Sequence, residues 1–270
     1  MAIDTLDKYI GAAKQRVIWM KTGTRTLVAA MPYTVFDIAG SPGAGTLAIG
    51  NTANGIVPVN GNNGYPLIKT FSGNTGYLSK VEYGSNVPCC FDLYDRLFAA
   101  GAYAYNSGTT NLSSQPSYSS RIINANYGGL QVWIEVVTAM TSATAWTVHI
   151  TYTDQDGNAG AISPDLPTMA ASALPIGRMY QLPLAAGDSG IQKIESIVVT
   201  TGSATAGSFN VMVLRPLWFG RVISANGGDV HDLLKTGFPQ IFETSALYNV
   251  LYADSTAVGL PDICMQIAMG

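Results

Sequence analysis

Alternation between apolar and polar residues is the dominant pattern of this chain. It is clearest over residues 130–138 and 146–154, where every second residue is apolar: Leu130, Val132, Ile134 and Val136 in the first segment, and Trp146, Val148, Ile150 and Tyr152 in the second. A period of two places such side chains on one face of a strand. Both segments are therefore predicted to be half-buried strands of an antiparallel sheet.

Similar strand signals recur along the rest of the chain. They cover residues 65–71, 77–83, 89–98, 178–184, 191–201 and 208–217. Turn-forming Gly, Asn and Pro residues separate the short apolar runs, as in residues 40–45, 51–55 and 60–64. No clear helical periodicity lies between these strands, which disfavours a crossover α/β architecture. We predict an all-β fold, an antiparallel jelly-roll-like sandwich with a short N-terminal helical arm.

The N-terminal residues follow a helical period instead. Ile3, Leu6, Ile10, Ala13 and Val17 recur at intervals of three and four, which places them on one face of a helix that begins near residue 4. Ile3, Leu6, Ile10 and Val17 are candidate partner-contact residues. Packing of this helix on the chain's own core is an equally good interpretation.

Residues 98–130 differ from the rest in composition. They carry one charged residue, Arg121, and are rich in Tyr, Ser, Asn and Gly. Tyr offers contact area at little entropic cost, and Ser and Asn offer adaptable hydrogen bonds, so this composition is typical of a binding surface. We predict a long contact loop here, with Tyr103, Tyr105 and Tyr118 as candidate partner contacts. A connecting loop that lies on the domain is the alternative.

The chain is thus predicted to have three parts. A helical arm covers residues 1–26, a β-sandwich domain covers 27–226 and includes the long loop, and a C-terminal β-rich arm covers 227–270. In the last part, strand-like pieces at 238–242, 246–252 and 262–269 are separated by turns. An exposed apolar segment such as the last of these would be adhesive, so we expect it to pair within the domain or to lie on a neighbour.

Charge is sparse throughout the chain. Of 270 residues, 11% are charged and 47% are hydrophobic, and the formal net charge is -3, whereas about 25% of an ordinary soluble domain is charged. So neutral a surface favours burial against copies of the chain or against a partner. No basic stripe is present to neutralise phosphates, so we expect no direct nucleic-acid binding. The N-terminus lacks the apolar run of a signal peptide, and no segment approaches the ~18 apolar residues of a membrane helix, so we expect synthesis in a cytosol and no membrane contact.

Candidate chemistry is scarce. His149 and His231 lie in no metal-binding spacing, and the three cysteines are interpreted as buried thiols. Residues 154–158, DQDGN, have part of the pattern of a calcium loop, but the acid that should follow stands two positions late, at Asp165, so a β-turn is the better interpretation. The acids Glu82, Asp92, Asp95 and Glu135 cannot be paired across a cleft from sequence. We predict no catalytic residue, no metal site and no cofactor.

Residues 188–222 read as a strand, a Gly/Thr turn and a second strand that closes on Arg215, Pro216 and Leu217. This layout, with the opening MAIDTLDKYIGAAKQRV and the Gly- and Asn-punctuated strands after it, resembles the accessory structural proteins of tailed bacteriophages, most of all the capsid decoration or cement type. The resemblance implies a non-enzymatic protein on the outer capsid surface of the virion, synthesised in the bacterial host cytoplasm. The implied partners are the major capsid protein and copies of the chain itself, as a homodimer or homotrimer.

Two other functions stay open on the sequence. A carbohydrate-binding or connector module of a phage tail or baseplate would use the Tyr and Trp residues and segment 98–130, with Tyr103 and Tyr105 as residues that stack on a sugar. A glycan hydrolase built on β-strands would need a pair of acids, and none can be nominated.

Overall fold

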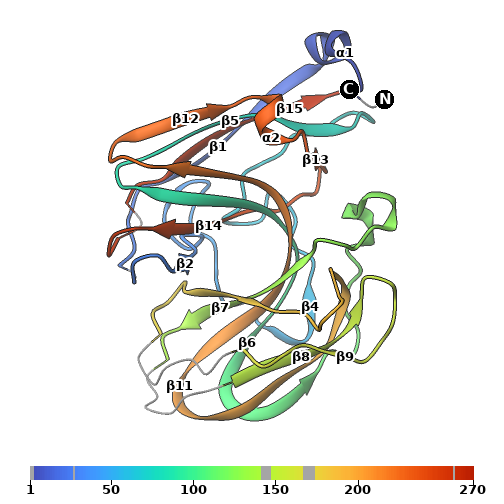
Figure 1. Ribbon diagram of the computed structural model, residues 1–270, viewed down its shortest axis with the longest axis vertical. Helices are drawn as coiled ribbons and strands as arrows, with labels where there is room; N and C mark the ends of the chain where they lie inside the picture. The colour runs from blue at the N-terminus through green and yellow to red at the C-terminus, as the bar shows by residue number, and fades with distance from the viewer. Residues whose placement is uncertain (1–2, 27, 141–146, 167–173, 258) are drawn as a thin grey trace. The chain divides into compact units, whose positions relative to one another are not determined.

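The computed structural model describes residues 3–26, 28–140, 147–166, 174–257 and 259–270. Antiparallel strands make up most of this part of the chain (Figure 1). Its contacts divide it into two compact units. Unit 1 comprises Met1–Thr46, Val59–Asp95 and Leu217–Gly270, and unit 2 comprises Leu47–Pro58 and Arg96–Pro216. Each unit has its own apolar core.

Unit 1 contains a six-stranded antiparallel sheet. Five of its strands follow the order β12-β5-β15-β1-β3, and the sixth strand, β13, also pairs with β5. The bounds are β1 (Ala13–Lys21), β3 (Gly40–Ser41), β5 (Gly76–Ser85), β12 (Gly227–His231), β13 (Gln240–Ile241) and β15 (Asp262–Met269). The helices α1 (Leu6–Gly11) and α2 (Leu233–Thr236) belong to the same unit. The last long strand of the chain, β15, therefore lies between β5 and β1.

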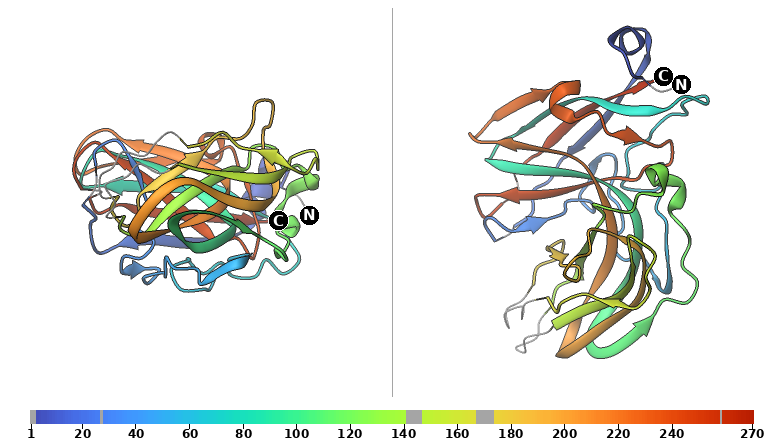
Figure 2. Two further views of the ribbon diagram at one scale, coloured as in Figure 1. Left: turned by 90° about the horizontal axis from the view of Figure 1, so that it is seen from below. Right: turned by 45° about the vertical axis from the view of Figure 1, so that its right-hand side comes forward.

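A second layer faces this sheet within unit 1. It is formed by β2 (Pro32–Tyr33), β14 (Leu247–Ala253) and the unit 1 portions of β6 (Cys89–Asn111) and β11 (Ile191–Val222) (Figure 2). Side chains from both layers interdigitate in one core: Val17, Trp19, Val81, Ile263 and Met265 from the six-stranded sheet, and Tyr33, Phe91, Leu93, Trp218 and Leu251 from the second layer. Burial of alternate residues on both sheets is the defining arrangement of a β-sandwich.

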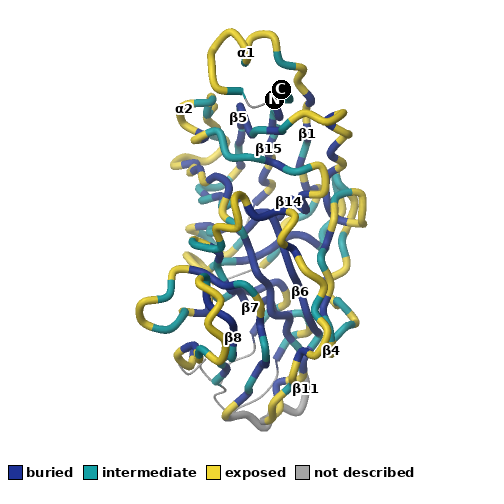
Figure 3. Tube along the Cα trace, turned by 90° about the vertical axis from the view of Figure 1, so that its right-hand side faces the viewer, coloured by how far each residue is buried: buried dark blue, intermediate teal, exposed yellow. Residues whose placement is uncertain are grey.

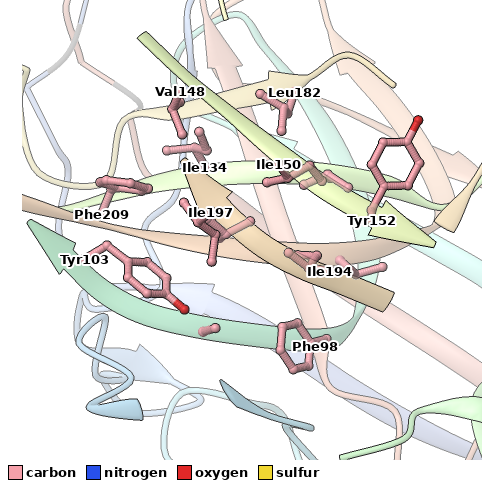
Figure 4. Close-up of a cluster of buried hydrophobic side chains, with 14 of the residues drawn as sticks. Phe98, Tyr103, Ile134, Val148, Ile150, Tyr152, Leu182, Ile194, Ile197 and Phe209 are labelled. Atoms are coloured by element: carbon pink, nitrogen blue, oxygen red, sulfur yellow. The ribbon is translucent and has the colours of Figure 1, made fainter. Parts of the chain in front are cut away.

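The core of unit 2 is enclosed by the remaining strands. These are β4 (Asn51–Ile56), β7 (Gln131–Thr138), β8 (Thr147–Asp154), β9 (Ala161–Ile162), β10 (Met179–Leu182) and the unit 2 portions of β6 and β11; two 3-10 turns, η1 (Ser119–Arg121) and η2 (Ile123–Ala125), precede β7. Ile134, Ile150, Ile197 and Phe209, from β7, β8 and β11, point toward one another in this core (Figure 4). The alternation over residues 147–154 thus places one face of β8 inside, whereas β7 is buried on both faces, since Trp133 and Glu135 are as covered as Ile134.

The all-β antiparallel sandwich with a short N-terminal helix is confirmed. Among the individual segments, 77–83, 89–98, 130–138 and 178–184 coincide with β5, β6, β7 and β10. Residues 147–154 form β8, and Trp146 lies outside the described residues. The strands expected at 191–201 and 208–217 belong to the single strand β11, so no turn separates them. Segment 65–71 is not a strand, although its Tyr65, Ile68 and Phe71 are buried.

The N-terminal helix is shorter than predicted. It ends at Gly11, and residues 13–21 are the strand β1, in which Gln15, Val17, Trp19 and Lys21 are buried in strict alternation. Val17 therefore belongs to a period of two and not to the helical face assigned to it. The β-branched pair at 17 and 18 fits a pleated, half-buried surface better than a helix, and pairing with β15 fixes that choice.

The long loop predicted at 98–130 is also wrong in its first half. Residues 98–111 continue strand β6, and Tyr103 and Tyr105 point inward against Phe209. Gly, Ala, Ser and Asn are poor strand formers, so local composition favoured a loop, but pairing with β4 and burial in the core outweigh that preference. The division into parts 1–26, 27–226 and 227–270 stays a prediction, while contacts group the residues into the two units above.

A buried ion pair connects three strands of unit 2. Arg96 on β6 and Glu135 on β7 are fully buried, with Nη2 of the arginine 3.5 Å from Oε2 of the glutamate. Asn210 on β11 donates from Nδ2 to the same carboxylate oxygen and to the Leu47 carbonyl, both at 2.7 Å. Buried charges are tolerated only when they are paired and hydrogen-bonded, so this network ties the register of β6, β7 and β11 together.

Removal of one partner of this pair should therefore be far more damaging than removal of both. We expect Glu135→Leu or Arg96→Met to lower the free energy of unfolding by about 3–5 kcal/mol each, because a charge is left buried without its counter-ion. The double variant should lose clearly less than the sum of the two. Urea unfolding of the four proteins measures this, with Glu82→Leu, at an exposed surface pair, as a control expected within about 0.5 kcal/mol of wild type. Additive losses would contradict the coupling.

A buried lysine holds the end of β1 in unit 1. Lys21 is 4% exposed, and its ammonium donates to the carbonyls of Pro42 at 3.1 Å and Gly43 at 3.3 Å. It also lies over the Trp19 ring, 5.6 Å from the centroid. Burial disfavours the charged form and lowers the pKa of Lys21 to about 8, against the opposing effect of Asp37.

This lowered pKa gives the stability of the chain a pH dependence of defined sign. Between about pH 8 and the ordinary lysine pKa of 10.5, the unfolded chain holds the Lys21 proton and the folded chain releases it, so folding is favoured as pH rises. We expect the free energy of unfolding of wild type, relative to Lys21→Met, to increase across this window and to be flat from pH 6 to about pH 7. Urea unfolding of both proteins at matched pH checks it. A relative stability that falls above pH 8 would show that the buried ammonium is stabilised by its site.

Candidate interaction surface

The helix α1 is defined by local polar contacts and not by burial. Thr5 caps its N-terminus, with Oγ1 accepting from the Lys8 amide at 3.3 Å. Asp4 and Lys8 form an exposed ion pair at 2.7 Å, in the favourable i, i+4 spacing. At the other end, the Lys14 ammonium donates to the carbonyls of Tyr9 at 2.9 Å and Ile10 at 3.3 Å. A cation at these orphan carbonyls complements the helix dipole, so six residues suffice for a turn and a half of helix.

One side chain, Tyr9, attaches α1 to the sheet. Its hydroxyl donates to Oε1 of Gln266 on β15 at 3.4 Å, and its ring packs edge-on against Phe238, with centroids 6.1 Å apart. No residue of α1 is buried. Leu6 and Ile10 are 66% and 65% exposed, so the apolar side of this helix faces solvent (Figure 3).

The short helix α2 borders the same surface. Asp232 is its N-cap and accepts from the amides of Leu234 and Lys235. Gly237 follows the helix in the left-handed conformation, at φ 69°, which glycine adopts without strain. The hydroxyl of buried Thr236 donates to the Leu78 carbonyl and fixes α2 to β5, while Leu234 points outward and is 82% exposed.

A polar triad secures the strand that leads into α2. The Trp218 indole donates to Nδ1 of His231 at 2.9 Å, and Nε2 of the same ring lies 3.2 Å from the Tyr83 hydroxyl. An indole N–H can only donate, so Nδ1 is the acceptor and the neutral ring carries its proton on Nε2. Asp229 lies 3.5 Å from Nε2. His231 thus serves as a structural connection between β5, β11 and β12.

An open, apolar groove of about 530 Å³ lies between α1 and α2. Its walls are formed mainly by Ile3, Leu6, Tyr9, Leu233, Leu234 and Phe238. The Phe238 ring stacks on Tyr77 with centroids 4.7 Å apart, which restrains this wall. Asp4 and Asp232 also line the groove. Mainly apolar walls with a few polar groups are typical of a protein interaction site.

The structure brings only part of the predicted contact set to this surface. Ile3 and Leu6 line the groove, and Ile10 is exposed on α1 beside them. Val17 is 2% exposed and packs in the unit 1 core. The remaining three lie in the unit 2 core, where they are at most 5% exposed: Tyr103, Tyr105 and Tyr118.

The three tyrosines are therefore corrected from contact residues to core residues. The Tyr103 hydroxyl donates to the Thr52 carbonyl, and the Tyr118 hydroxyl donates to the Ile191 carbonyl. All three rings are buried, so none is available to a sugar or to a partner. Leu234 and Phe238 were missed, although the Asp232 cap and Gly237, one helical turn later, form a readable helix signature.

The four acids considered for catalysis are each engaged within their own unit. Glu82 pairs with Lys80 on the surface, Asp95 accepts from Ser245 and the Ala246 amide, and Glu135 belongs to the buried pair with Arg96. Burial raises the pKa of Asp92 against hydrogen bonds from Tyr252 and Tyr94. Glu82 lines an open groove with Asp229 and Asp262, and none of the other three acids lines that groove.

The other candidate chemistry resolves into turns and isolated thiols. The Asp154 carboxylate accepts from the Asn158 side-chain amide and from the backbone amides of Asp156 and Asn158. These hydrogen bonds lower the pKa of Asp154 and close the turn between β8 and β9. Asp165 lies 2.9 Å from Nδ1 of His149. The three cysteines are free, and burial raises the pKa of Cys89 to about 12. Nowhere in the described ranges do three or more His, Cys, Asp or Glu side chains gather so as to hold a metal ion.

None of the helices in the described part of the chain is long and apolar enough to span a lipid bilayer.

Comparison with known proteins yields weak likenesses alone. No protein-family model matches the sequence, and no curated protein matches it. Among solved structures, the chain aligns with infectious bursal disease virus of the Gx strain at 11% identity and TM-score 0.19, over 96% of this chain and 80% of the other. The alignment with the Gt strain has 12% identity and a TM-score of 0.20, and it covers 100% of this chain and 83% of the other. The alignment with the VP2 subviral particle of that virus has 10% identity and a TM-score of 0.20, and it covers 96% of this chain and 80% of the other. At TM-scores this low, the alignments establish neither a common fold nor a common function.

Truncation of the nominated side chains should separate core from surface. We expect Tyr105→Ala to lower the free energy of unfolding by about 3–5 kcal/mol, because a buried aromatic side chain is replaced by a cavity. Leu6→Ala, on the exposed side of α1, should change it by less than about 0.5 kcal/mol. Urea or thermal unfolding measures both. A Tyr105→Ala protein as stable as wild type would return this residue to the surface.

Proposed function

We propose that this chain is a non-enzymatic structural protein of a virus particle, of the capsid decoration or cement type. It binds the outer capsid surface through contacts with the major capsid protein and with copies of itself, after synthesis in the host cytoplasm. The observation that carries the proposal is the groove between α1 and α2, which is lined by the exposed side chains of Leu6 and Leu234.

The energetics of that surface favour a partner. A helix that buries none of its own residues gains little from the fold, and an exposed leucine forgoes about 1.5–3 kcal/mol relative to full burial. Contact with a partner would recover this free energy at every copy. On a repeating capsid lattice, several modest contacts of this kind combine by avidity into firm attachment.

The chain's composition supports the same function. Only 11% of the residues are charged, so much of the exterior of each unit is neutral and can be covered at small desolvation cost. The resemblance of residues 188–222 and of the N-terminal segment to tailed-bacteriophage accessory proteins supports a phage particle and its major capsid protein as the partner. The module of a tail or baseplate loses its nominated sugar-binding residues, because Tyr103 and Tyr105 are buried.

The test is co-sedimentation with capsid shells assembled from the major capsid protein of the same virus. We expect wild type to pellet with shells, and Leu6→Asp or Leu234→Asp to bind about tenfold more weakly or worse, because each places a charge in an apolar contact. Ile162→Asp is the matched control, since Ile162 is 59% exposed but lies on β9 in unit 2. It should bind as wild type does.

Two outcomes would contradict the proposal. Absence of wild-type protein from the shell pellet would remove the capsid as partner. Equal binding by all four proteins would remove the groove as the contact surface. Immunogold labelling of intact virions with antibodies against the chain gives a second readout, in which label on the tail and not on the head would favour the tail or baseplate function.

A further inference from the structure

The strand β1 has an open edge. It is the last long strand on its side of the six-stranded sheet, and the short strand β3 pairs only with Met20 and Lys21. Within the described part of the chain, residues 14–18 pair with β15 on one side and with no strand on the other. Unpaired backbone groups on an edge strand are a template for an added strand.

The register shows which backbone groups point outward. The Thr22 amide donates to the Ala39 carbonyl at 2.9 Å, on the β3 side. Successive residues of a strand direct their backbone groups to opposite sides, and the ladder between β1 and β15 has no register shift from residue 13 to residue 20. The N–H and C=O groups of Arg16 and Ile18 therefore point toward the open edge, and those of Val17 and Trp19 bond to β15.

The chain's own neighbouring segment does not close this edge. After β3, Pro42 has no N–H to extend the pairing, and Lys21 holds the Pro42 and Gly43 carbonyls instead. On the other side, the amide of the buried Gln15 side chain bonds both to the Lys69 N–H at 2.9 Å and to the Lys69 carbonyl at 3.3 Å. This segment is thus anchored to a side chain on the core side of β1, and the ladder position beside Arg16 and Ile18 stays vacant.

An open groove of about 520 Å³ runs along the vacant position. Its walls are residues 16–18 of β1, residues 41–44 after β3 and residues 61–67. Leu67 on the far wall is 65% exposed. Of all the residues that line the groove, Arg16 alone carries a charge, and its Nε donates to the Cys264 sulfur at 2.8 Å, which holds the side chain over the sheet.

The charge of this edge selects the occupant. Lys14 and Arg16 both stand on β1, and no acid lines the groove. A second copy paired through its own β1 would bring a second Arg16 to the ladder, and this groove holds no acid to compensate the two cations, which disfavours self-pairing. A strand with a carboxylate opposite Arg16 would instead gain a cross-strand ion pair, and an apolar residue two positions away would cover Leu67.

We propose that β1 binds an extended acidic segment of a partner protein as an added strand, hydrogen-bonded to the backbone of Arg16 and Ile18. The backbone provides the affinity, while Arg16 and Leu67 provide the selectivity. This inference depends on the geometry of β1 alone and not on the capsid function, whose contact surface is the groove between α1 and α2.

The test uses the full chain and two synthetic heptapeptides with blocked ends, Thr-Val-Glu-Val-Thr-Val-Thr and the same sequence with Lys in place of Glu. Amide hydrogen exchange, followed residue by residue by NMR, is the readout. With the Glu peptide at millimolar concentration, we expect exchange at Arg16 and Ile18 to slow about fivefold or more, with Val17 and Trp19 unchanged because they already bond to β15. The Lys peptide should have no effect.

The variant Arg16→Glu supplies the matched control, because the Arg16 side chain is exposed on β1. It should reverse the preference, so that the Lys peptide protects and the Glu peptide does not. Three results would overturn the proposal: exchange at Arg16 and Ile18 as slow as at Val17 in the free protein, no protection by either peptide, or equal protection by both. Shell binding that is lost in Leu6→Asp but kept in Arg16→Glu would leave the capsid function intact whichever way the peptides behave.

Discussion

The pairing of β15 with two strands from the first third of the chain is the interaction on which unit 1 depends. Its eight residues bond to β1 on one side and to β5 on the other, so the sheet is discontinuous until this segment is in place. Ile263, Met265 and Ile267 from the same strand fill the core between the layers. The loops closed by these pairings are long, and such contacts slow folding because their entropy is lost before the contacts form. The same pairings leave β1 with a single open edge.

The buried charged side chains described above have partners inside their own unit. In unit 2, even a buried arginine and glutamate have each other and Asn210 as partners, and the tyrosine hydroxyls at 103 and 118 reach backbone carbonyls. In unit 1, by contrast, α1 and α2 leave apolar side chains in solvent, and β1 leaves backbone groups without a strand. Both features are unsatisfied in the free chain and both can be satisfied by another protein. The proposed function in assembly rests on these features together and not on any single residue.

Most strands could be predicted from the sequence, but the surface features, the groove between α1 and α2 and the open edge of β1, could not. Alternation over 130–138 and 147–154 located β7 and β8, because a period of two survives any arrangement of neighbours. Residues 13–21 were misread because Val17 fits both a helical period and a strand period. Pairing with β15, which is distant in sequence, makes this segment a strand. Tyr103 and Tyr105 were misread because a Tyr-, Ser- and Asn-rich segment is equally suited to a binding loop and to a strand whose partners bury it. The groove and the open edge depend on which segments meet, and that information is not local.

The strands β6 and β11 each contribute residues to both units, with the boundary after Asp95 in one and after Pro216 in the other. Phe91 and Leu93 of β6 enter the unit 1 core, and Leu97 and Phe98 enter the unit 2 core. A slip of one residue exchanges the two faces of a strand, so a slip anywhere along β6 would expose apolar residues in both cores at once. A shift in the strand pairing of β6 in one unit would therefore also destabilise the core of the other unit. We therefore expect the folding of the two cores to be coupled through β6 and β11.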